Sequence, residues 1–348
     1  MAKTFRIGVL GLTHDHVWGN LEELARLDHG KLVAAADPHG PLLEKIKSLY
    51  GCTCYGDPEE LLQREQLDAV YVFSDNVRGA QLAELALSCG LHVFIEKPMA
   101  ATLAGAERML AAARQSGARL MINWPFAWWP QLQHAIRFVK EGNIGDLWQV
   151  KYRAAHQGPR ELGCSTDFCD WLYDASRNGA GAFMDYCCYG TVLARCLLGV
   201  PSRVMGFAGR LTKEDILVED NAMLMMTYPR AFAMAEGSWS QIGKLTGYLT
   251  ALYGTRGTLL VEPRVGGKLL LATDSKPEGE NLPVPEAAPE NRSGSAHFLH
   301  ALETGSPFGP LCEARVCRDA QEMLEAGLLS IEAGRETSLP FKNFLTSE

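Results

Sequence analysis

Short apolar segments alternate with amphipathic segments through the first 124 residues of the chain. The apolar segments lack a polar face, and the amphipathic segments repeat their apolar residues at helical spacing. Strands that are apolar on both faces are typical of a parallel sheet covered by helices. The pattern predicts an α/β domain at residues 1–124, a doubly wound parallel sheet of the Rossmann type. The predicted strands are 5–12, 31–37, 68–74, 92–98 and 119–124, and the predicted helices are 16–27, 40–51, 57–65, 78–90 and 102–117.

The pattern changes after residue 124, where strand candidates follow one another with few helices between them. This order predicts a second domain of the α+β class at residues 125–345, built on a large and mostly antiparallel sheet. Residues 274–295 are rich in Pro, Glu, Asn and Ser, which predicts a surface loop. Residues 314–334 have helical spacing, and this helix could pack on either domain. The predicted strands of the second domain are 147–157, 203–211, 221–229, 231–241, 248–263 and 267–273.

The composition of the chain excludes several classes of function. With 33 basic and 41 acidic residues the net charge is −8, and no run of Lys or Arg offers a track for a nucleic-acid backbone. No apolar stretch approaches the roughly 20 residues that span a membrane, and the first residues enter a strand without the apolar core of a signal peptide. We therefore expect a cytoplasmic protein with no nucleic-acid or membrane partner, in which most of the ten cysteines are reduced thiols.

The first predicted strand ends at Gly11 and a helix follows, which is how dinucleotide-binding domains begin. If Gly11 is the first glycine of the G-x-G-x-x-G fingerprint, Thr13 and His16 occupy the second and third glycine positions. Only one third of the fingerprint is then present. We expect Gly11, Thr13, His14 and His16 to contact the cofactor.

A second cofactor feature stands at the end of the second predicted strand, where Asp37 follows an apolar run. An acidic residue at this place accepts hydrogen bonds from the adenosine ribose hydroxyls, and its charge repels a 2′-phosphate. Asp37 therefore predicts NAD as the cofactor, with NADP less favoured. The alternative is a turn-forming aspartate before Pro38.

His14 and His16 also form an H-x-H pair, which binds metal after the first strand of some barrel hydrolases. Such a site needs further ligands at the ends of later strands, but the other histidines fall mostly at the starts of predicted elements. The alternation of strands and helices also stops after five or six units, whereas a barrel has eight. We therefore predict no metal, and we assign the two histidines to helix capping or to contacts with phosphate or substrate.

Three further stretches carry the most specific signal in the sequence. The first follows a predicted strand, the second is E-K-P at the end of the next strand, and the third is a glycine-rich D-x-x-x-Y sequence that begins a helix. Together with the order of the domains, they resemble the glucose-fructose oxidoreductase / inositol dehydrogenase / MocA (Gfo/Idh/MocA) family of NAD(P)-dependent oxidoreductases. The resemblance covers nearly the whole chain. The residues concerned are Ser74, Asn76, Glu96, Lys97, Pro98, Asp185 and Tyr189.

The resemblance implies a place for each residue of the first two stretches. It puts Glu96 near the nicotinamide ribose and Lys97 beside the reacting carbon, with a cis peptide bond between Lys97 and Pro98. It also implies that Ser74 and Asn76 line the cofactor groove.

Asp185 and Tyr189 match the aspartate and the acid/base position of the family's glycine-rich motif. Tyrosine at that position is similar to the glucose-fructose oxidoreductase and dihydrodiol dehydrogenase branches. Oxidation of an alcohol requires a base for the hydroxyl proton, and Tyr189 serves only if its pKa falls from about 10. Reaching neutrality requires about 3 to 4 kcal/mol from Lys97 and the positive ring of the cofactor. We predict that Lys97, Asp185 and Tyr189 are catalytic; on spacing alone the last two could be a helix cap and a core residue.

The sequence departs from the family at a stretch where many members have arginines. Within residues 123–130, Phe126 and Ala127 occupy the arginine positions, and tryptophans surround them. Aromatic faces stack on sugar rings, so we expect a neutral sugar or polyol rather than an anion, although the cluster could also be core packing. The predicted substrate contacts are Trp124, Trp128, His156, Trp171 and Tyr173.

These features predict an NAD-dependent oxidoreductase that transfers hydride between nicotinamide and a sugar, polyol or related cyclic alcohol. Two alternatives stay open: a glycoside hydrolase or lyase that recycles a tightly bound NAD, and a module that binds a nucleotide or sugar without catalysis. The resemblance also implies a homo-oligomer, a dimer or tetramer assembled through the exposed face of the second-domain sheet.

Overall fold

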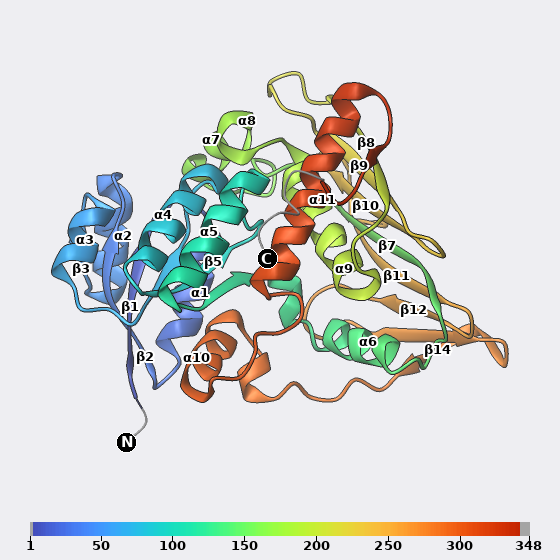
Figure 1. The fold of residues 1–348 in the computed structure, drawn as a ribbon, viewed down its shortest axis with the longest axis horizontal. Coiled ribbons are helices and arrows are strands. Elements are labelled where there is room, and N and C mark those ends of the chain that lie inside the picture. Colours follow the sequence, from blue (N-terminus) through green and yellow to red (C-terminus); the bar gives the residue numbers. More distant parts are fainter. Residues whose placement is uncertain (1–2, 342–348) are drawn as a thin grey trace.

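Six parallel strands form the first sheet of the computed structural model, which describes residues 3–341 (Figure 1). The strand order reverses between β1 and β4, so the carboxyl ends of these two strands flank the crevice where doubly wound sheets bind ligands. The sheet confirms the predicted fold, and the pattern missed only the three-residue β3. Across the sheet the order is β3 (Thr53–Tyr55), β2 (Gly30–Ala36), β1 (Phe5–Leu10), β4 (Ala69–Val72), β5 (His92–Glu96) and β6 (Leu120–Asn123).

Five helices alternate with these strands, and three of them begin at a side-chain cap while two end at a glycine. Asp57, Asp75 and Thr102 each accept a hydrogen bond from a backbone N–H in the first turn of the following helix. Gly51 and Gly117 end α2 and α5 in the left-handed conformation. The N-terminal caps fix the loops that leave the carboxyl ends of the strands. The helices are α1 (His16–Ala25), α2 (Gly40–Tyr50), α3 (Pro58–Arg64), α4 (Asn76–Ser88) and α5 (Leu103–Ser116).

Nine strands form the second sheet, and neighbouring strands are antiparallel except for β7 and β10. This arrangement confirms the mostly antiparallel sheet that the sequence predicts. The order is β14 (Lys276–Leu282), β13 (Leu269–Thr273), β12 (Thr258–Val261), β11 (Tyr248–Gly254), β7 (Leu147–Ala155), β10 (Phe232–Ser238), β9 (Asn221–Thr227), β8 (Arg203–Gly209) and β15 (Thr337–Ser338).

Two predictions for this sheet are wrong. The sequence predicts a loop at 274–295, but β14 occupies part of it and pairs with β13. An edge strand is paired on one side and largely faces solvent, so it lacks the apolar alternation of inner strands. The sequence also predicts one strand at 248–263, where a turn divides β11 from β12 and Gly254 donates to the main-chain oxygen of Gly257.

Several helices of the second domain are missing from the sequence-based prediction. Some are too short to show a helical period. α9 is the helix that the D-x-x-x-Y stretch predicts, and because it is buried around nearly its whole circumference, only that motif and no amphipathic period marks it. α6 and α9 lie on the side of the large sheet that faces the first domain (Figure 1). The helices are η1 (Pro125–Trp128), α6 (Pro130–Lys140), α7 (Thr166–Leu172), α8 (Ala175–Asn178), η2 (Phe183–Cys187), α9 (Cys188–Leu198) and η3 (Pro289–Asn291).

The last two helices tie the two domains together. α10 (Gly294–Thr304) packs on α1, and the ring of Phe298 lies 5.7 Å from that of Phe94 in the first sheet. α11 (Ala314–Ala333) contacts α5 of the first domain and β8 of the second, and it lies between them in Figure 1. The predicted final helix therefore packs on both domains. Residues 342–345 of the predicted second domain lie outside the described residues.

All ten cysteines lie within the described residues and all are free thiols, which agrees with the prediction that most of them are reduced. Between residues 3 and 341, no helix has the length and apolar character needed to cross a membrane.

Candidate active site

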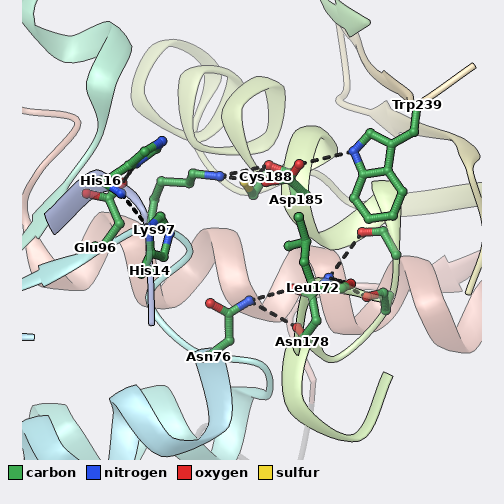
Figure 2. A network of polar contacts seen from close by, with 12 residues as sticks. His14, His16, Asn76, Glu96, Lys97, Leu172, Asn178, Asp185, Cys188 and Trp239 are labelled. Carbon is green, nitrogen blue, oxygen red and sulfur yellow. Dashed lines mark hydrogen bonds and ion pairs between the residues drawn. The ribbon is translucent and has the colours of Figure 1, made fainter. Parts of the chain in front are cut away.

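Lys97 and Asp185 form a buried ion pair between the two domains (Figure 2). Lys97 follows β5, and its Nζ donates to Oδ1 of Asp185 at 2.7 Å and to the main-chain oxygen of Asp185 at 3.3 Å. Lys97 is 4% exposed and Asp185 is 7% exposed. The peptide bond between Lys97 and Pro98 is cis, as predicted. The pair therefore joins the carboxyl end of the first sheet to the second domain.

Each partner of this pair holds the other in its charged form. Burial by itself lowers the pKa of Lys97 and raises the pKa of Asp185. The opposite charge and the hydrogen bond between them outweigh burial, so the pKa of Lys97 is raised and the pKa of Asp185 is lowered. Oδ2 of Asp185 accepts a hydrogen bond from Nε1 of Trp239 at 3.2 Å, so both carboxylate oxygens have a partner.

Asp185 lies in a π-helical turn, η2, directly before α9. The widened turn leaves the main-chain oxygen of Asp185 open to side chains, and it accepts from Nζ of Lys97 and from Sγ of Cys188. Turns of this kind recur at functional sites. The local widening, which the D-x-x-x-Y spacing does not predict, gives Lys97 a second acceptor.

Tyr189 follows Asp185 by four residues, and the ammonium of Lys97 lies over its ring. Nζ of Lys97 is 4.9 Å from the ring centroid. The ring packs edge-on against Trp124 at 5.4 Å and stacks on Tyr152 at 5.8 Å. The structure thus brings together the three residues that the sequence predicts to be catalytic.

The predicted lowering of the pKa of Tyr189 depends on Lys97 and on the positive ring of a bound cofactor. Without cofactor, burial raises the pKa of this phenol well above its ordinary value, and nearby Tyr152 and Cys188 raise it further. Lys97 faces the ring, and its charge is balanced by Asp185. Tyr189 is therefore a neutral phenol in the protein without cofactor.

The loop after β1 turns at Gly11, whose φ is +84°. A Cβ atom at this position would lie 2.9 Å from Cβ of Ser74 and 3.0 Å from the main-chain oxygen of Phe73. Glycine is required because it tolerates this φ and because the carboxyl ends of β1 and β4 approach each other closely here. The next N–H, that of Leu12, donates to Oδ2 of Asp37 at 2.7 Å.

Side chains replace the second and third glycines of the fingerprint. Thr13 is buried, and its Oγ1 has no hydrogen-bond partner among the described residues. Nδ1 of His14 accepts a hydrogen bond from the backbone N–H of His16 at 3.2 Å, so His14 caps the start of α1. Nδ1 of His16 lies 3.1 Å from Oε1 of Glu96. The loop therefore keeps its first glycine and fills the rest of the turn with polar side chains.

Gly11, Thr13, Asp37 and Ser74 line one cavity of about 270 Å³ at the carboxyl ends of the first sheet. Asp37 is buried, and its Oδ1 accepts from the backbone N–H of His39 at 2.8 Å and contacts the ring Nδ1 of His39 at 2.7 Å. A carboxylate has about four acceptor sites, so Asp37 retains capacity for a ligand hydroxyl. Four of the predicted cofactor residues thus share one space.

Asn76 bridges the two domains. Its Nδ2 donates to Oδ1 of Asn178 at 2.7 Å and to the main-chain oxygen of Asn178 at 3.1 Å (Figure 2). A second bridge joins Asp15 to Ser165, whose hydroxyl donates to Oδ1 at 2.6 Å. The contact of Asn76 with a cofactor stays a prediction.

Glu96 is held by a short chain of polar contacts. Its Oε2 accepts from Nδ2 of Asn123 at 2.8 Å, and Oδ1 of Asn123 accepts from Nε1 of Trp128 at 2.8 Å. The sequence predicts that Trp128 contacts substrate, but its indole nitrogen already donates to Asn123. Trp128 therefore orients Glu96 through Asn123, and its contact with substrate stays a prediction.

Two other predicted substrate contacts are parts of the packing. Trp124 and Trp171 are both 1% exposed. The indole nitrogen of Trp124 donates to Sγ of Cys317, and that of Trp171 donates to the main-chain oxygen of Thr13. Trp171 thus supports the loop after β1, and neither ring offers a free face to a sugar.

His156 and Tyr173 are the remaining predicted substrate contacts; His156 lies near the charge of Asp185, and Tyr173 packs on Trp239, which donates to Asp185. Nδ1 of His156 accepts from the backbone N–H of Gly158 at 2.8 Å, which places the proton of the neutral ring on Nε2. Burial lowers the pKa of His156, and the charge of Asp185 opposes this effect. Tyr173 packs edge-on against Trp239 with the ring centroids 5.4 Å apart.

Both domains match models of one protein family. Residues 5–124 match the model described as the oxidoreductase family with an NAD-binding Rossmann fold, and residues 132–260 match the GFO/IDH/MocA C-terminal domain. The chain belongs to the Gfo/Idh/MocA family. This result confirms the resemblance that rests on the E-K-P and D-x-x-x-Y stretches.

Relatives of this Gfo/Idh/MocA protein include D-apiose dehydrogenase of Paraburkholderia graminis, which is 28% identical over 64% of this chain and 55% of the relative. The dTDP-3,4-didehydro-2,6-dideoxy-alpha-D-glucose 3-reductase of Actinomadura kijaniata is 31% identical over 64% of this chain and 65% of the relative. The chain thus matches 55% and 65% of the lengths of these relatives. Among solved structures, the WlbA dehydrogenase from Bordetella pertussis, in complex with NADH and UDP-GlcNAcA, has a TM-score of 0.82. It is 18% identical and covers 98% of this chain and 100% of that chain, so the likeness shows the fold alone.

The residues of this Gfo/Idh/MocA site have the geometry and the polar groups that a dinucleotide needs. Gly11 allows the close approach that pyrophosphate binding needs, and the buried Oγ1 of Thr13 is a donor without a partner among the described residues. Arg78 and Arg177 line the same cavity as Asp37 and offer positive charge to phosphate groups. These residues would hold the dinucleotide along the carboxyl edge of the first sheet.

Three residues of the site escaped the sequence analysis. Trp239 donates to Asp185, and Asn123 holds Glu96. Glu219 accepts two main-chain N–H groups at the start of η2, at 2.6 and 2.9 Å, and so fixes the turn that carries Asp185. Each of the three reaches the site from a different part of the fold. Local patterns in the sequence of this chain do not mark such long-range partners.

Proposed function

We propose that this chain is a nicotinamide-dependent dehydrogenase that exchanges hydride with a hydroxyl-bearing carbon of a sugar, polyol or related cyclic alcohol. The observation that carries the proposal is the buried Lys97–Asp185 pair over the ring of Tyr189, at the carboxyl edge of the first sheet. Preorganised donors in a dry site stabilise a developing charge without the cost of reorganising solvent. The family of the chain and the names of its relatives support this class of reaction.

When bound, the nicotinamide ring supplies the hydride donor or acceptor. Lys97 stays protonated because Asp185 stabilises its charge, and Tyr189 stays a neutral phenol because it is buried. In the reducing direction, the carbonyl oxygen of the substrate accepts hydrogen bonds from both groups, and one of their protons passes to it. In the oxidising direction one of the two groups must first release its proton to solvent, and it then accepts the proton of the substrate hydroxyl.

A neutral sugar or polyol is the substrate class that the surroundings favour. Phe126 and Ala127 occupy the positions where many family members have arginines, and both are buried apolar residues. The neutral ring of His156 offers an Nε2–H donor for a hydroxyl group. The two relatives described above are named for a sugar and for a nucleotide-linked sugar, which supports the same class.

NAD is the cofactor that we propose, with NADP less favoured. The carboxylate of Asp37 lines the cavity, where its charge would repel a 2′-phosphate. Fluorescence titration should give a Kd for NADH at least tenfold lower than that for NADPH. Asp37→Ala should reduce this preference, while a protein that binds NADPH as tightly as NADH would contradict the assignment.

We also propose a homo-oligomer, a dimer or tetramer, assembled through the outer face of the second sheet. Phe207 and Phe232 point out from this face and are 54% and 52% exposed, and Phe207 borders a shallow hollow with Leu211 and Met223. Apolar surface of this kind is typical of an interface. Light scattering should give at least twice the mass of one chain, and Phe207→Asp should lower this mass.

We also propose that the protein is cytoplasmic. The free thiols support a reducing compartment such as the cytoplasm.

Absorbance at 340 nm tests the proposed reaction directly. The chain is mixed with NAD⁺ and a panel of aldoses and polyols, and we expect stoichiometric NADH with at least one of them. Lys97→Met should lower kcat by a factor of about 10³, while Lys47→Met, at an exposed lysine of α2, should not change it. Formation of product without net NADH would contradict the proposal and indicate a recycled cofactor.

A further inference from the structure

His14, His16 and Glu96 gather three metal-ligand atoms in one place. These atoms all lie within 4.8 Å of one another. The two histidines come from the loop after β1 and from the start of α1, and Glu96 ends β5, so the fold brings them together from the carboxyl ends of two strands on either side of β4 (Figure 2). His14 is 1% exposed and Glu96 is 4% exposed. The sequence predicts no metal, because the other histidines fall mostly at the starts of elements and the fold is not a barrel; Glu96 is a ligand of another type that stands at the end of a later strand.

Two of these atoms face each other without a hydrogen bond between them. Nδ1 of His16 and Oε1 of Glu96 are 3.1 Å apart, yet both are buried atoms without a hydrogen-bond partner among the described residues. Ligand atoms about 2.0 to 2.2 Å from a tetrahedral metal lie roughly 3.4 Å apart. The observed separation is therefore close to that between two ligands of one metal ion.

Glu96 is held in the orientation that a ligand needs. Asn123 donates to Oε2 at 2.8 Å and is itself fixed by Trp128, so Oε1 is the oxygen left to face His16. Hydrogen bonds from a second layer of residues orient the ligands of metal sites in this way. The chain from Trp128 to Glu96 thus presents one carboxylate oxygen to the cluster.

His14 offers a lone pair without losing a proton. Its Nδ1 accepts from the backbone N–H of His16 at 3.2 Å, so the proton of the neutral ring lies on Nε2 and the lone pair on Nδ1 points toward residue 16. The ring is packed 4.8 Å from Phe168 and 5.5 Å from Trp171. A cation bound at Nδ1 would replace this one long hydrogen bond.

We propose that His14, His16 and Glu96 bind one divalent cation of the zinc type when no dinucleotide is bound. Two imidazoles and one carboxylate form a recognised ligand set for Zn²⁺, with a fourth position left for water. The nearby ammonium of Lys97 is balanced by Asp185 at 2.7 Å, so the negative charge of Glu96 is available to the cation.

The cation and the dinucleotide compete for the same residues. His16 stands at the third glycine position of the cofactor loop, and Glu96 is the carboxylate that the family resemblance places near the nicotinamide ribose. Either ligand therefore excludes the other. This competition goes beyond the proposed dehydrogenase activity. It concerns which ligand, cation or dinucleotide, occupies the loop after β1, and it can be measured without turnover.

Calorimetry on the full chain tests the site after treatment with EDTA and gel filtration. We expect Zn²⁺ to bind with one high-affinity equivalent, and Co²⁺ to give visible absorption bands in the same stoichiometry. His16→Ala and Glu96→Gln should each weaken binding at least tenfold. The matched control is His300→Ala, which removes a histidine on α10 outside the cluster and should leave Kd unchanged.

Addition of NAD⁺ should raise the apparent Kd of Zn²⁺ in proportion to the NAD⁺ concentration. His16 has a side chain that is 39% exposed, so His16→Ala should fold, and circular dichroism checks this. Equal Zn²⁺ affinity in the wild-type chain and in His16→Ala would overturn the proposal, as would unchanged Zn²⁺ affinity at saturating NAD⁺. Loss of the dehydrogenase assignment would leave the metal titration unaffected, so the two failures are distinguishable.

Discussion

The indole nitrogen of Trp239 donates to the oxygen of Asp185 that does not contact Lys97, at 3.2 Å. Trp239 is fully buried and reaches Asp185 from the residue after β10, so the second sheet holds the carboxylate from the side opposite the first domain. Because both oxygens are occupied, the carboxylate has little freedom to turn away from the ammonium. The position of Lys97 at the candidate reaction centre thus depends on Trp239, which acts through Asp185.

Trp239→Phe removes this hydrogen bond and keeps most of the ring. A hydrogen bond to a charged buried group contributes about 1.5 to 3 kcal/mol, so we expect the free energy of unfolding to fall by about 2 kcal/mol and kcat/KM to fall at least tenfold. Urea denaturation and steady-state kinetics measure the two effects. Trp148→Phe is the control, because Trp148 is 43% exposed and its indole donates to the neutral main-chain oxygen of Gly254. An equal loss in both variants would contradict the assignment.

The Lys97–Asp185 pair should show strong coupling in a double-mutant cycle. Asp185→Asn alone leaves a buried ammonium without its counter-charge, which costs about 3 to 5 kcal/mol. Lys97→Met combined with Asp185→Asn removes both charges and should be more stable than either single variant. Urea denaturation at pH 7 gives the four free energies.

The exposed pair of Arg108 and Glu84, whose atoms are 2.9 Å apart, provides the comparison. Its coupling energy should stay below about 1 kcal/mol, because solvent screens exposed pairs. If the effects at Lys97 and Asp185 simply add, the pair is not the coupled unit described above.

Gly11→Ala should weaken both the fold and the binding of dinucleotide. The new Cβ would meet Ser74 at 2.9 Å and the main-chain oxygen of Phe73 at 3.0 Å, and alanine also disfavours a φ of +84°. We expect a loss of about 2 to 3 kcal/mol in the free energy of unfolding and at least a tenfold rise in the Kd of NADH. Gly51→Ala separates the two causes, because Gly51 has a φ of +66° but open space around it. That control should cost about 1 kcal/mol and leave the Kd unchanged.

Asp220 should make the stability of the protein depend on pH in the acid range. Burial raises its pKa, but backbone N–H groups of residues 211, 212 and 213 and the hydroxyl of Thr212 donate to its carboxylate, so its pKa is held well below the ordinary value. A lowered pKa in the folded state contributes stability above the unfolded pKa of about 3.9 and loses it as the pH falls through the folded value. Asp220→Asn should therefore cost about 3 kcal/mol at pH 7 and progressively less below about pH 4.

Thermal unfolding between pH 3 and pH 8 checks this dependence. Asp274→Asn, at an exposed position between β13 and β14, should follow the wild-type profile. A constant difference between Asp220→Asn and wild type across the range would show that the charge of Asp220 does not contribute.

The sequence predicts the first domain well because its strands are apolar on both faces and its helices are amphipathic. The same logic fails at β14, where an edge strand of polar residues resembles a loop. At α9, burial on nearly all sides removes the helical period, so only the D-x-x-x-Y motif predicts that helix. Local patterns report how a segment meets its surroundings, so they are weakest where those surroundings are all solvent or all protein.

In the candidate site, too, some residues were predicted from the sequence and others were not. Lys97, Asp185 and Tyr189 belong to motifs and were found, and the structure brings them together. Trp239 and Glu219 were not found, because their contacts join segments far apart in the chain. The pKa of Tyr189 could not be predicted either, since its direction depends on burial and on the pairing of Lys97 rather than on which residues are present.

The return of α10 to the first sheet has a mechanical consequence. The polypeptide crosses between the two domains after β6, again before α10, and a third time through α11, which contacts both domains before β15 joins the second sheet. Three crossings restrict the movement of one domain relative to the other more than a single linker would.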